Sequence, residues 1–200
     1  DPRWLKNAES IASYLKQFLL SPNGSFYVSQ DADVAGIADN RQYFALSDAK
    51  RRALGMPRID QHEYTDATAQ AAEAFLHLYA ADQKPAYLAI AERALNWIMT
   101  ARVAQQTEQM LVFHHDANPS LAYYLTDHLA AARAFLAMYR VSGDVVWLTR
   151  SQQTTNAIVQ YFAHAEAGFQ TAQTNAELIQ APPVVEENIY VVRFLNLLFQ

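Results

Sequence analysis

Two stretches of this sequence match position by position: EAFLHLYAADQKPAYL at 73–88 and RAFLAMYRVSGDVVWL at 133–148. Phe75 corresponds to Phe135, an offset of 60 residues, and the same offset carries Phe135 to Leu195. Repeats of this length are built from small structural units that bury their apolar faces only against neighbouring units. The sequence therefore predicts a repetitive architecture.

The amino-terminal part follows the same plan, because Trp4 and Phe26 are separated by 22 residues, as are Trp147 and Phe169. The unit consists of a helix, a short loop, a second helix and a longer segment with a brief strand. Such units form either an α/α toroid, with an inner and an outer ring of helices, or an α-solenoid. The strands in the long segments favour the toroid, where they would gather at one mouth.

We therefore predict an all-α fold: an α/α toroid of helical hairpins, part of a six-hairpin barrel, with short β segments in the connecting loops. Residues 1–200 hold about half of such a ring, so they form a single domain or a fragment whose open edges other chains would cover. Apolar residues at helical spacing predict helices at 2–20, 64–81, 85–103, 121–141, 144–165 and from 186 onward. Brief strands are expected at 26–28, 110–113 and 168–170.

The composition argues against several classes of protein. The net charge is -5, and no cluster of Lys or Arg forms the basic stripe of a nucleic-acid surface. No apolar run is long enough for a transmembrane helix, and the first residues do not resemble a signal peptide. With no cysteine, the chain cannot form disulfides or a cysteine-ligated zinc site. None of these features indicates a cellular compartment.

Carboxylates recur at equivalent positions of the repeat. Asp66, Asp127 and Glu187 are spaced 61 and 60 residues apart, each near the start of a helix that we assign to the inner ring. Acidic residues at such positions are ordinary partners of helix amino termini. Because these starts should meet at one rim, the same residues are also candidates to line a site: Asp66 and Asp127 as catalytic groups and Glu187 as a substrate ligand.

Histidines lie close to these carboxylates in the sequence. His115 belongs to a His114-His115-Asp116 run after the strand at 110–113, and an imidazole beside a carboxylate can act as a general acid or base. Adjacent residues of a strand point to opposite faces, so at most one of this pair would face the mouth. We predict no metal site. His62, before the helix at 64–81, is a similar candidate for a general acid or base, and His128 beside Asp127 is a weaker one.

A second pair of carboxylates, Asp31 and Asp33, follows the apolar strand at 26–28. The spacing resembles half of a calcium loop, but the distal glutamate of that pattern is missing, so calcium is disfavoured. The pair either closes a turn or contributes to the mouth, with Asp33 catalytic and Asp31 in contact with substrate. Aromatic rings such as Tyr27 and Tyr64 lie at segment ends, where they would either pack in the core or provide faces for a sugar ring.

The order of five motifs resembles the thioredoxin-domain-containing proteins of the YyaL and spermatogenesis-associated type. The motifs are GSFYVSQDADV, RQYFALSDAKRR, PRIDQHEYTDATA, LAYYLTDHLA and APPVVEEN. The resemblance implies a toroid similar to those of N-acylglucosamine 2-epimerases and six-hairpin glycosidases, with a thioredoxin-like domain outside this chain. The family's motifs are altered at Gln61-His62, at Ala67-Thr68 and at Thr126-Asp127-His128.

Two functions follow from the sequence. In the first, the toroid binds or acts on a saccharide without a cofactor. It would be an epimerase that uses His115 or His62, or a glycosidase that pairs Asp31 or Asp33 with Asp66 or Asp127. The predicted substrate ligands are Asp31, Tyr27, His62, Tyr64 and Glu187. In the second, the toroid is a non-catalytic scaffold for the thioredoxin-like domain or another protein.

Overall fold

The computed structural model describes residues 1–37, 39–118, 122–164, 166, 168–174 and 181–200. Three helices share one orientation and begin 60 residues apart: α4 (Thr65–Asp82), α6 (Leu125–Ser142) and α8 (Val185–Phe199). The helices that follow the first two, α5 (Pro85–Ala101) and α7 (Val145–Phe162), also begin 60 residues apart. The predicted repeat is confirmed at the level of helix starts.

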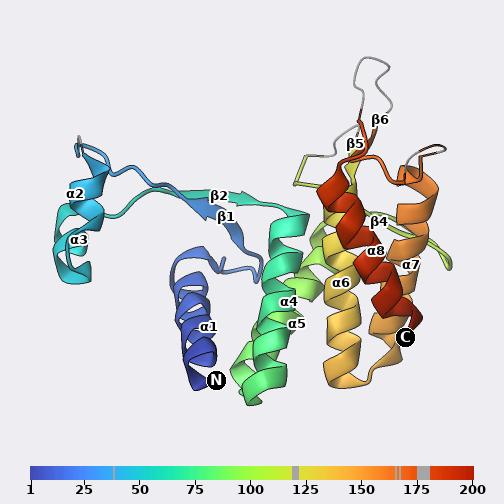
Figure 1. Ribbon diagram of the computed structural model, residues 1–200, viewed down its shortest axis with the longest axis horizontal. Coiled ribbons are helices and arrows are strands. Elements are labelled where there is room, and N and C mark those ends of the chain that lie inside the picture. Colours follow the sequence, from blue (N-terminus) through green and yellow to red (C-terminus); the bar gives the residue numbers. More distant parts are fainter. Residues whose placement is uncertain (38, 119–121, 165, 167, 175–180) are drawn as a thin grey trace.

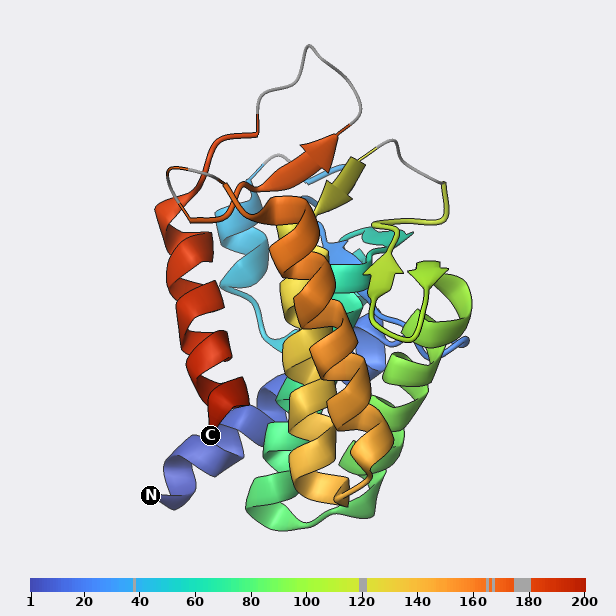
Figure 2. The ribbon, with the colours of Figure 1, turned by 90° about the vertical axis from the view of Figure 1, so that its right-hand side faces the viewer.

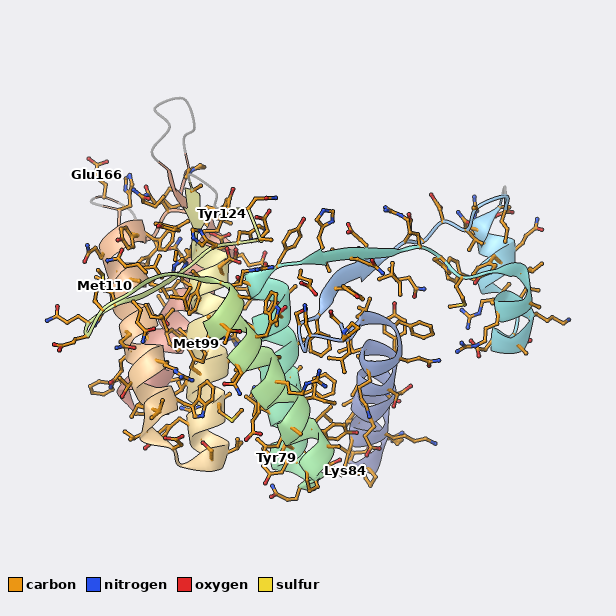
Figure 3. The ribbon with its side chains drawn as sticks, turned by 180° about the vertical axis from the view of Figure 1, so that it is seen from behind. Tyr79, Lys84, Met99, Met110, Tyr124 and Glu166 are labelled. Atoms are coloured by element: carbon orange, nitrogen blue, oxygen red, sulfur yellow. The ribbon has the colours of Figure 1, made fainter. Side chains whose placement is uncertain are left out.

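The helices form two layers (Figures 1 and 2). We call α4, α6 and α8 the inner helices and α5 and α7 the outer helices. The inner helices begin at the end of the bundle that carries the strands, which we call the mouth (Figure 1). Figure 3 shows Tyr124 at this end, whereas Tyr79 and Lys84 lie at the opposite end. The all-α fold of helical hairpins is thus confirmed, and the structure is part of an α/α toroid.

The first helix, α1 (Pro2–Tyr14), is an outer helix as well. Its amino terminus is capped by Asp1, whose side chain accepts a hydrogen bond from the backbone N–H of Arg3 at 2.9 Å. It ends in a π-helical turn, η1 (Leu15–Leu19). It runs in the same direction as α5 and α7 and packs beside α4 (Figure 1).

Short antiparallel ladders fill the connections between hairpins. β1 (Tyr27–Gln30) pairs with β2 (Ile59–Glu63), and β3 (Val103–Gln106) pairs with β4 (Leu111–Phe113). A third ladder joins β5 (Ala122–Tyr124) to β6 (Ala172–Thr174). The strands expected at 26–28 and 110–113 are confirmed. Residues 169 and 170 form only isolated bridges, to Ala163 and Pro183.

The structure corrects some predicted boundaries. The helix expected from residue 121 begins at Leu125, because residues 122–124 pair with β6 instead. Position 121 itself, and position 165 where the next helix was expected to end, lie outside the described residues. Two short helices, α2 (Asn40–Phe44) and α3 (Asp48–Leu54), were not predicted. They lie beyond the far end of the β1–β2 ribbon (Figure 1).

Aromatic rings connect the layers in the same way in two repeats. Phe75 of α4 stacks on Phe26 and contacts Tyr87 of α5, with ring centroids 5.7 and 5.8 Å apart. Phe135 of α6 contacts Phe113 at 6.1 Å and stacks on Trp147 of α7 at 5.7 Å. Both phenylalanines are buried. The matching stretches are therefore the central core positions of two hairpins.

Substitution of Gly168 by alanine should destabilise the mouth. Gly168 has φ +67°, and an added Cβ would lie 2.3 Å from Oδ1 of Asn188. Asn188 cannot easily move, because its amide bonds both the N–H and the C=O of Phe169. We expect a loss of about 2–4 kcal/mol in the free energy of unfolding, from the left-handed backbone and the clash together.

Gly143→Ala is the matched control for this substitution. Gly143 has φ +71°, but its added Cβ would meet nothing within 4 Å. Gly143→Ala should therefore lower the free energy of unfolding only through the unfavourable left-handed backbone conformation of alanine, by about 1–2 kcal/mol. Urea denaturation measures both variants, and equal losses would show that the contact with Asn188 has no energetic weight.

Candidate functional site

The site forms where the loop after β4 meets the start of α4. The backbone N–H of Thr65 donates to the carbonyl of His115 at 3.0 Å, and the Thr65 hydroxyl donates to the carbonyl of His114 at 2.5 Å. Tyr64 is the amino-terminal cap residue of α4 and makes no side-chain capping hydrogen bond. These bonds fix His115 above the first turn of α4.

A carboxylate and an imidazole meet at this point. Nδ1 of His115 lies 3.0 and 3.1 Å from the two carboxylate oxygens of Asp127 in the first turn of α6. Oδ1 of Asp127 also accepts the backbone N–H of Asp66 at 3.0 Å, which joins the starts of α4 and α6. The side chain of Asp127 is fully buried, whereas that of His115 is 28% exposed. We call His115 and Asp127 the dyad.

The two members of the dyad influence each other's protonation. The hydrogen bond to the Asp127 carboxylate raises the pKa of His115 above its ordinary 6.5. Burial raises the pKa of Asp127, and the hydrogen bond from His115 opposes this effect. With Nδ1 directed at the carboxylate, the remaining ring nitrogen of His115, Nε2, is the one that can exchange protons with a ligand.

Aromatic rings frame the imidazole. Tyr64 stacks on His115 with centroids 4.3 Å apart and an interplanar angle of 17°, and Tyr124 meets it edge-on at 5.2 Å. His62 stacks on the other side of Tyr64 at 5.9 Å. His62 is itself hydrogen-bonded to Asp60 and is largely exposed. The predicted residue Tyr64 thus lies against the dyad, whereas His62 is in contact with Tyr64 rather than with either member of the dyad.

His128, which follows Asp127 in the sequence, has a structural role. His128 is fully buried, where Nε2 accepts the N–H of Phe113 at 3.2 Å and Nδ1 donates to the carbonyl of Tyr124 at 2.8 Å. Burial lowers the pKa of His128 to about 4, so it remains neutral. The ring of His114 lies 6.3 Å from that of Tyr123. Only His115 of the adjacent pair reaches the carboxylates, but the two histidines follow the end of β4 in a loop, so the alternation expected of a strand does not apply to them.

The structure does not bring Asp31 and Asp33 to the dyad. Both follow β1 towards α2 and α3, at the end of the ribbon that points away from the helices (Figure 1). Asp31 accepts the N–H of Asp33 at 3.1 Å, and Asp33 bonds the side chain of Asn40. These contacts close a turn, so pairing of either residue with Asp66 or Asp127 has no support in this structure. Tyr27 pairs with Glu63 in the ribbon and packs against the core.

Glu187 lies in a groove of about 600 Å³ between the inner helices. Neither member of the dyad lines this groove, but two lining residues, Thr126 and Gln70, belong to the first turn of α6 and the second turn of α4. Its polar and aromatic lining includes residues that the sequence did not single out: Gln70, Glu73, His77, Thr126, Arg133 and Tyr190.

The 60-residue offset could have identified part of this lining. Glu73 and Arg133 occupy equivalent positions on α4 and α6, and they form an ion pair at 3.1 Å. Arg133 also lies over the ring of Tyr190 at 6.0 Å. One carboxylate oxygen of Glu187 is buried without a hydrogen-bond partner in the described part of the chain. A ligand with hydroxyl groups could satisfy it.

Ligand atoms of Asp66, His115 and Asp127 lie within 4.8 Å of one another. Two carboxylates and an imidazole also suit a divalent cation. In this structure, however, Nδ1 of His115 bonds directly to both oxygens of Asp127. The observed arrangement is therefore a hydrogen-bonded acid–base pair.

Replacement of Asp127 by asparagine should lower the pKa of His115. The carboxylate stabilises the protonated imidazole, so its removal shifts the pKa back towards 6.5. NMR titration of the imidazole C–H resonances measures this shift. Asp60→Asn is the control, because it removes the partner of His62 and leaves the dyad intact. An unchanged pKa in the Asp127 variant would contradict the described contact.

Comparisons with known proteins identify the fold. The sequence matches no family model and no curated protein. The structure resembles a cellobiose 2-epimerase from Bacillus thermoamylovorans, with a TM-score of 0.68 and 17% identity over 98% of this chain and 50% of that one. It also resembles a family-76 α-mannanase from Bacteroides thetaiotaomicron, with a TM-score of 0.69 and 11% identity over 99% of this chain and 46% of that one.

A third similar structure is a Salegentibacter α-1,6-mannanase, an inactive variant in complex with α-1,6-mannotriose. The TM-score is 0.60 and the identity 14%, over 98% of this chain and 64% of that one. The chain has the helical-hairpin fold of these six-hairpin toroids and spans about half the length of the first two. No helix among the described residues is long and apolar enough to cross a membrane.

Proposed function

We propose that this chain binds a saccharide at the mouth of the toroid and transfers a proton on it, with His115 as the base. The observation that carries the proposal is the dyad, in which a buried carboxylate orients an imidazole that is open to ligand on its other side. Proteins of the same fold include sugar epimerases and mannanases, which supports a saccharide as the ligand.

The chemistry that fits the dyad is epimerisation of a reducing sugar. Asp127 holds His115 with Nδ1–H directed inward, so the lone pair of Nε2 can take a proton from the carbon next to the sugar carbonyl. The C–H electrons move towards the carbonyl oxygen and form an enediolate. A water molecule on the opposite face then donates a proton to that carbon, which gives the epimer, and protonated His115 returns its proton to the hydroxide that is left.

Glycoside hydrolysis fits the same residues less well. It uses two carboxyl groups, about 5–5.5 Å apart in retaining enzymes and farther apart in inverting ones, and both must reach the sugar. Asp66 and Asp127 approach within 4.8 Å, but Asp127 is buried and already bonded to His115 and to Asp66. Asp127 therefore suits the orientation of His115 better than attack on a sugar carbon.

Recognition of the sugar follows from the surroundings of the dyad. Tyr64 and Tyr124 are half-buried beside His115, and the exposed parts of these rings suit the C–H surfaces of a pyranose. Asp66, His62 and Glu187 offer hydrogen bonds to hydroxyl groups. Asp31, Asp33 and Tyr27 are not part of this proposal, because the two carboxylates bond within their own turn and Tyr27 packs against the core.

Deuterium exchange tests the proposal. Glucose, mannose and cellobiose are incubated with the chain in D₂O and followed by NMR. We expect deuterium at the carbon next to the carbonyl of at least one sugar, together with its epimer. New reducing ends without deuterium would indicate hydrolysis, and no change in any sugar would oppose an active epimerase. Either outcome would overturn the assignment of His115 as the base.

The motif resemblance adds a separate proposal: the 200 residues form one toroid unit that associates with a thioredoxin-like domain outside this chain. It rests on the ordered motifs alone, and no contact in the structure bears on it. Co-purification with such a domain from the same source would support it, and its failure would leave the saccharide proposal unaffected.

A further inference from the structure

An arginine lies in the core beside the dyad, at a position where the next repeat has an apolar residue. Arg102 follows the last residue of α5 and is only 5% exposed. The 60-residue offset makes it equivalent to Phe162 at the end of α7, which is fully buried in a core cluster with residues of α6 and α8. Burial of a guanidinium costs free energy unless hydrogen bonds compensate for the lost water. The hydrogen bonds of Arg102 therefore indicate what this residue contributes.

The guanidinium of Arg102 bonds two backbone carbonyls. Nη2 donates to the carbonyl of Glu63, the last residue of β2, at 3.0 Å. Nη1 donates to the carbonyl of Ala101 at 3.0 Å, and the group lies 4.3 Å from the ring centroid of Trp97. Nε is buried without a hydrogen-bond partner in the described part of the chain. The side chain therefore holds the end of β2 against the end of α5.

The backbone of Arg102 holds a second segment of the site. Its carbonyl accepts the N–H of His114 at 2.8 Å, and the carbonyl of His114 accepts the hydroxyl of Thr65 at 2.5 Å. Because Thr65 lies two residues after Glu63, these contacts close a ring of hydrogen bonds that passes through Arg102 on both sides. One of the two segments that the ring joins carries Tyr64, and the other carries the histidine of the dyad.

The next repeat shows which of these contacts needs an arginine. The carbonyl of Phe162 accepts the N–H of Gln170 at 2.8 Å, so the backbone contact is made there as well. The side chain of Phe162 has no donor and packs against the ring of His128, with centroids 5.2 Å apart. The guanidinium bond to the end of β2 is therefore what Arg102 adds to the plan of the repeat, and it is added next to the dyad.

We propose that Arg102 is a positioning residue, which holds Tyr64 against His115 through its bond to the carbonyl of Glu63. The stack of Tyr64 on His115, at 4.3 Å and 17°, fixes the plane of the imidazole and thus the direction of Nε2. A misplacement of about 1 Å in a reacting group can lower a rate about 10²-fold. A guanidinium stays charged over the whole range in which His115 titrates. The catalytic side of this role rests on the proposed function, in which His115 is the base.

NMR of the His115 imidazole C–H resonances, without sugar, tests the proposal. The ring current of Tyr64 shifts these resonances, and Tyr64→Leu supplies their values without the stack. We expect Arg102→Met to move them most of the way to those values, with unchanged helical circular dichroism. The same variant should lose about 10–10²-fold in the rate of sugar deuteration. Arg150→Met is the matched control, because Arg150 lies over Trp147 at 4.4 Å near the start of α7, away from the mouth (Figure 2). It should leave both readouts unchanged.

Arg102→Lys replaces the methionine variant if the latter does not fold. Lysine keeps the charge, but its ammonium lacks the planar fork that bonds Glu63 and Ala101 together, so the His115 resonances should move in the same direction. Native His115 resonances in the folded Arg102 variant would overturn the proposal, and so would an equal shift in Arg150→Met. If the native chain exchanges no sugar, the proposed function fails, whereas the resonances still decide whether Arg102 holds the stack.

Discussion

Replacement of His115 by alanine should lower the rate of sugar deuteration by about 10²–10⁴-fold, the usual contribution of a positioned general base. Of the two members of the dyad, only His115 is partly exposed. Asp127 is buried, and its carboxylate is already bonded to His115 and to the backbone of Asp66. The measurement is the NMR exchange rate at the carbon next to the carbonyl. The rate should rise with pH through the pKa of His115, which lies above 6.5, since only the neutral ring accepts a proton.

His164→Asn is the matched control for this loss. His164 is exposed at the end of the outer helix α7, where it accepts the N–H of Glu166. Its replacement should leave the exchange rate unchanged. If His115→Ala retains the native rate while folding normally, another group is the base and the proposed mechanism is wrong.

Replacement of Phe135 by alanine should reduce the free energy of unfolding by about 3–5 kcal/mol. The ring is fully buried between Phe113 of β4 and Trp147 of α7, so its removal leaves a cavity between the strand and both layers of helices. Urea denaturation with an unchanged slope would measure this loss, because the slope reports the surface exposed on unfolding.

Phe44→Ala is the control, because it makes the same substitution at an exposed position. Phe44 is 47% exposed at the end of α2, and its truncation should cost less than about 1 kcal/mol. A loss at Phe135 no larger than at Phe44 would show that the matching stretches do not form the core of the repeat.

The helices could be predicted from the sequence because each has a long apolar stripe that recurs in the next unit. The starts of α4, α6 and α8 confirm the 60-residue period derived from Phe75 and Phe135. The small elements could not be predicted in this way. β5 and β6 have three residues each and exist through their pairing with each other, which no local pattern shows. The helix α2 has five residues, too few for a periodic signal.

The candidate site could be predicted in part for a similar reason. Asp66 and Asp127 share a place in the repeat, so parallel inner helices bring them to one rim, and His115 reaches them from the strand before α6. Asp31 and Asp33 lie outside the inner helices, and the direction of their ribbon depends on tertiary contacts. One of these is the bond from Ser25 to Glu63 at 2.6 Å. The repeat could therefore be predicted from the sequence, whereas the path of the segments that connect its helices could not.

The most direct test of the account is an NMR titration of His115 with saccharide. The account predicts a saturable shift of the His115 imidazole resonances on addition of the sugar that exchanges deuterium, with no shift at His164. The same sugar should leave the pKa of buried His128 unchanged, because that ring is bonded on both sides within the core. If no saccharide moves the His115 resonances, or if His164 moves equally, the mouth of the toroid is not a sugar site.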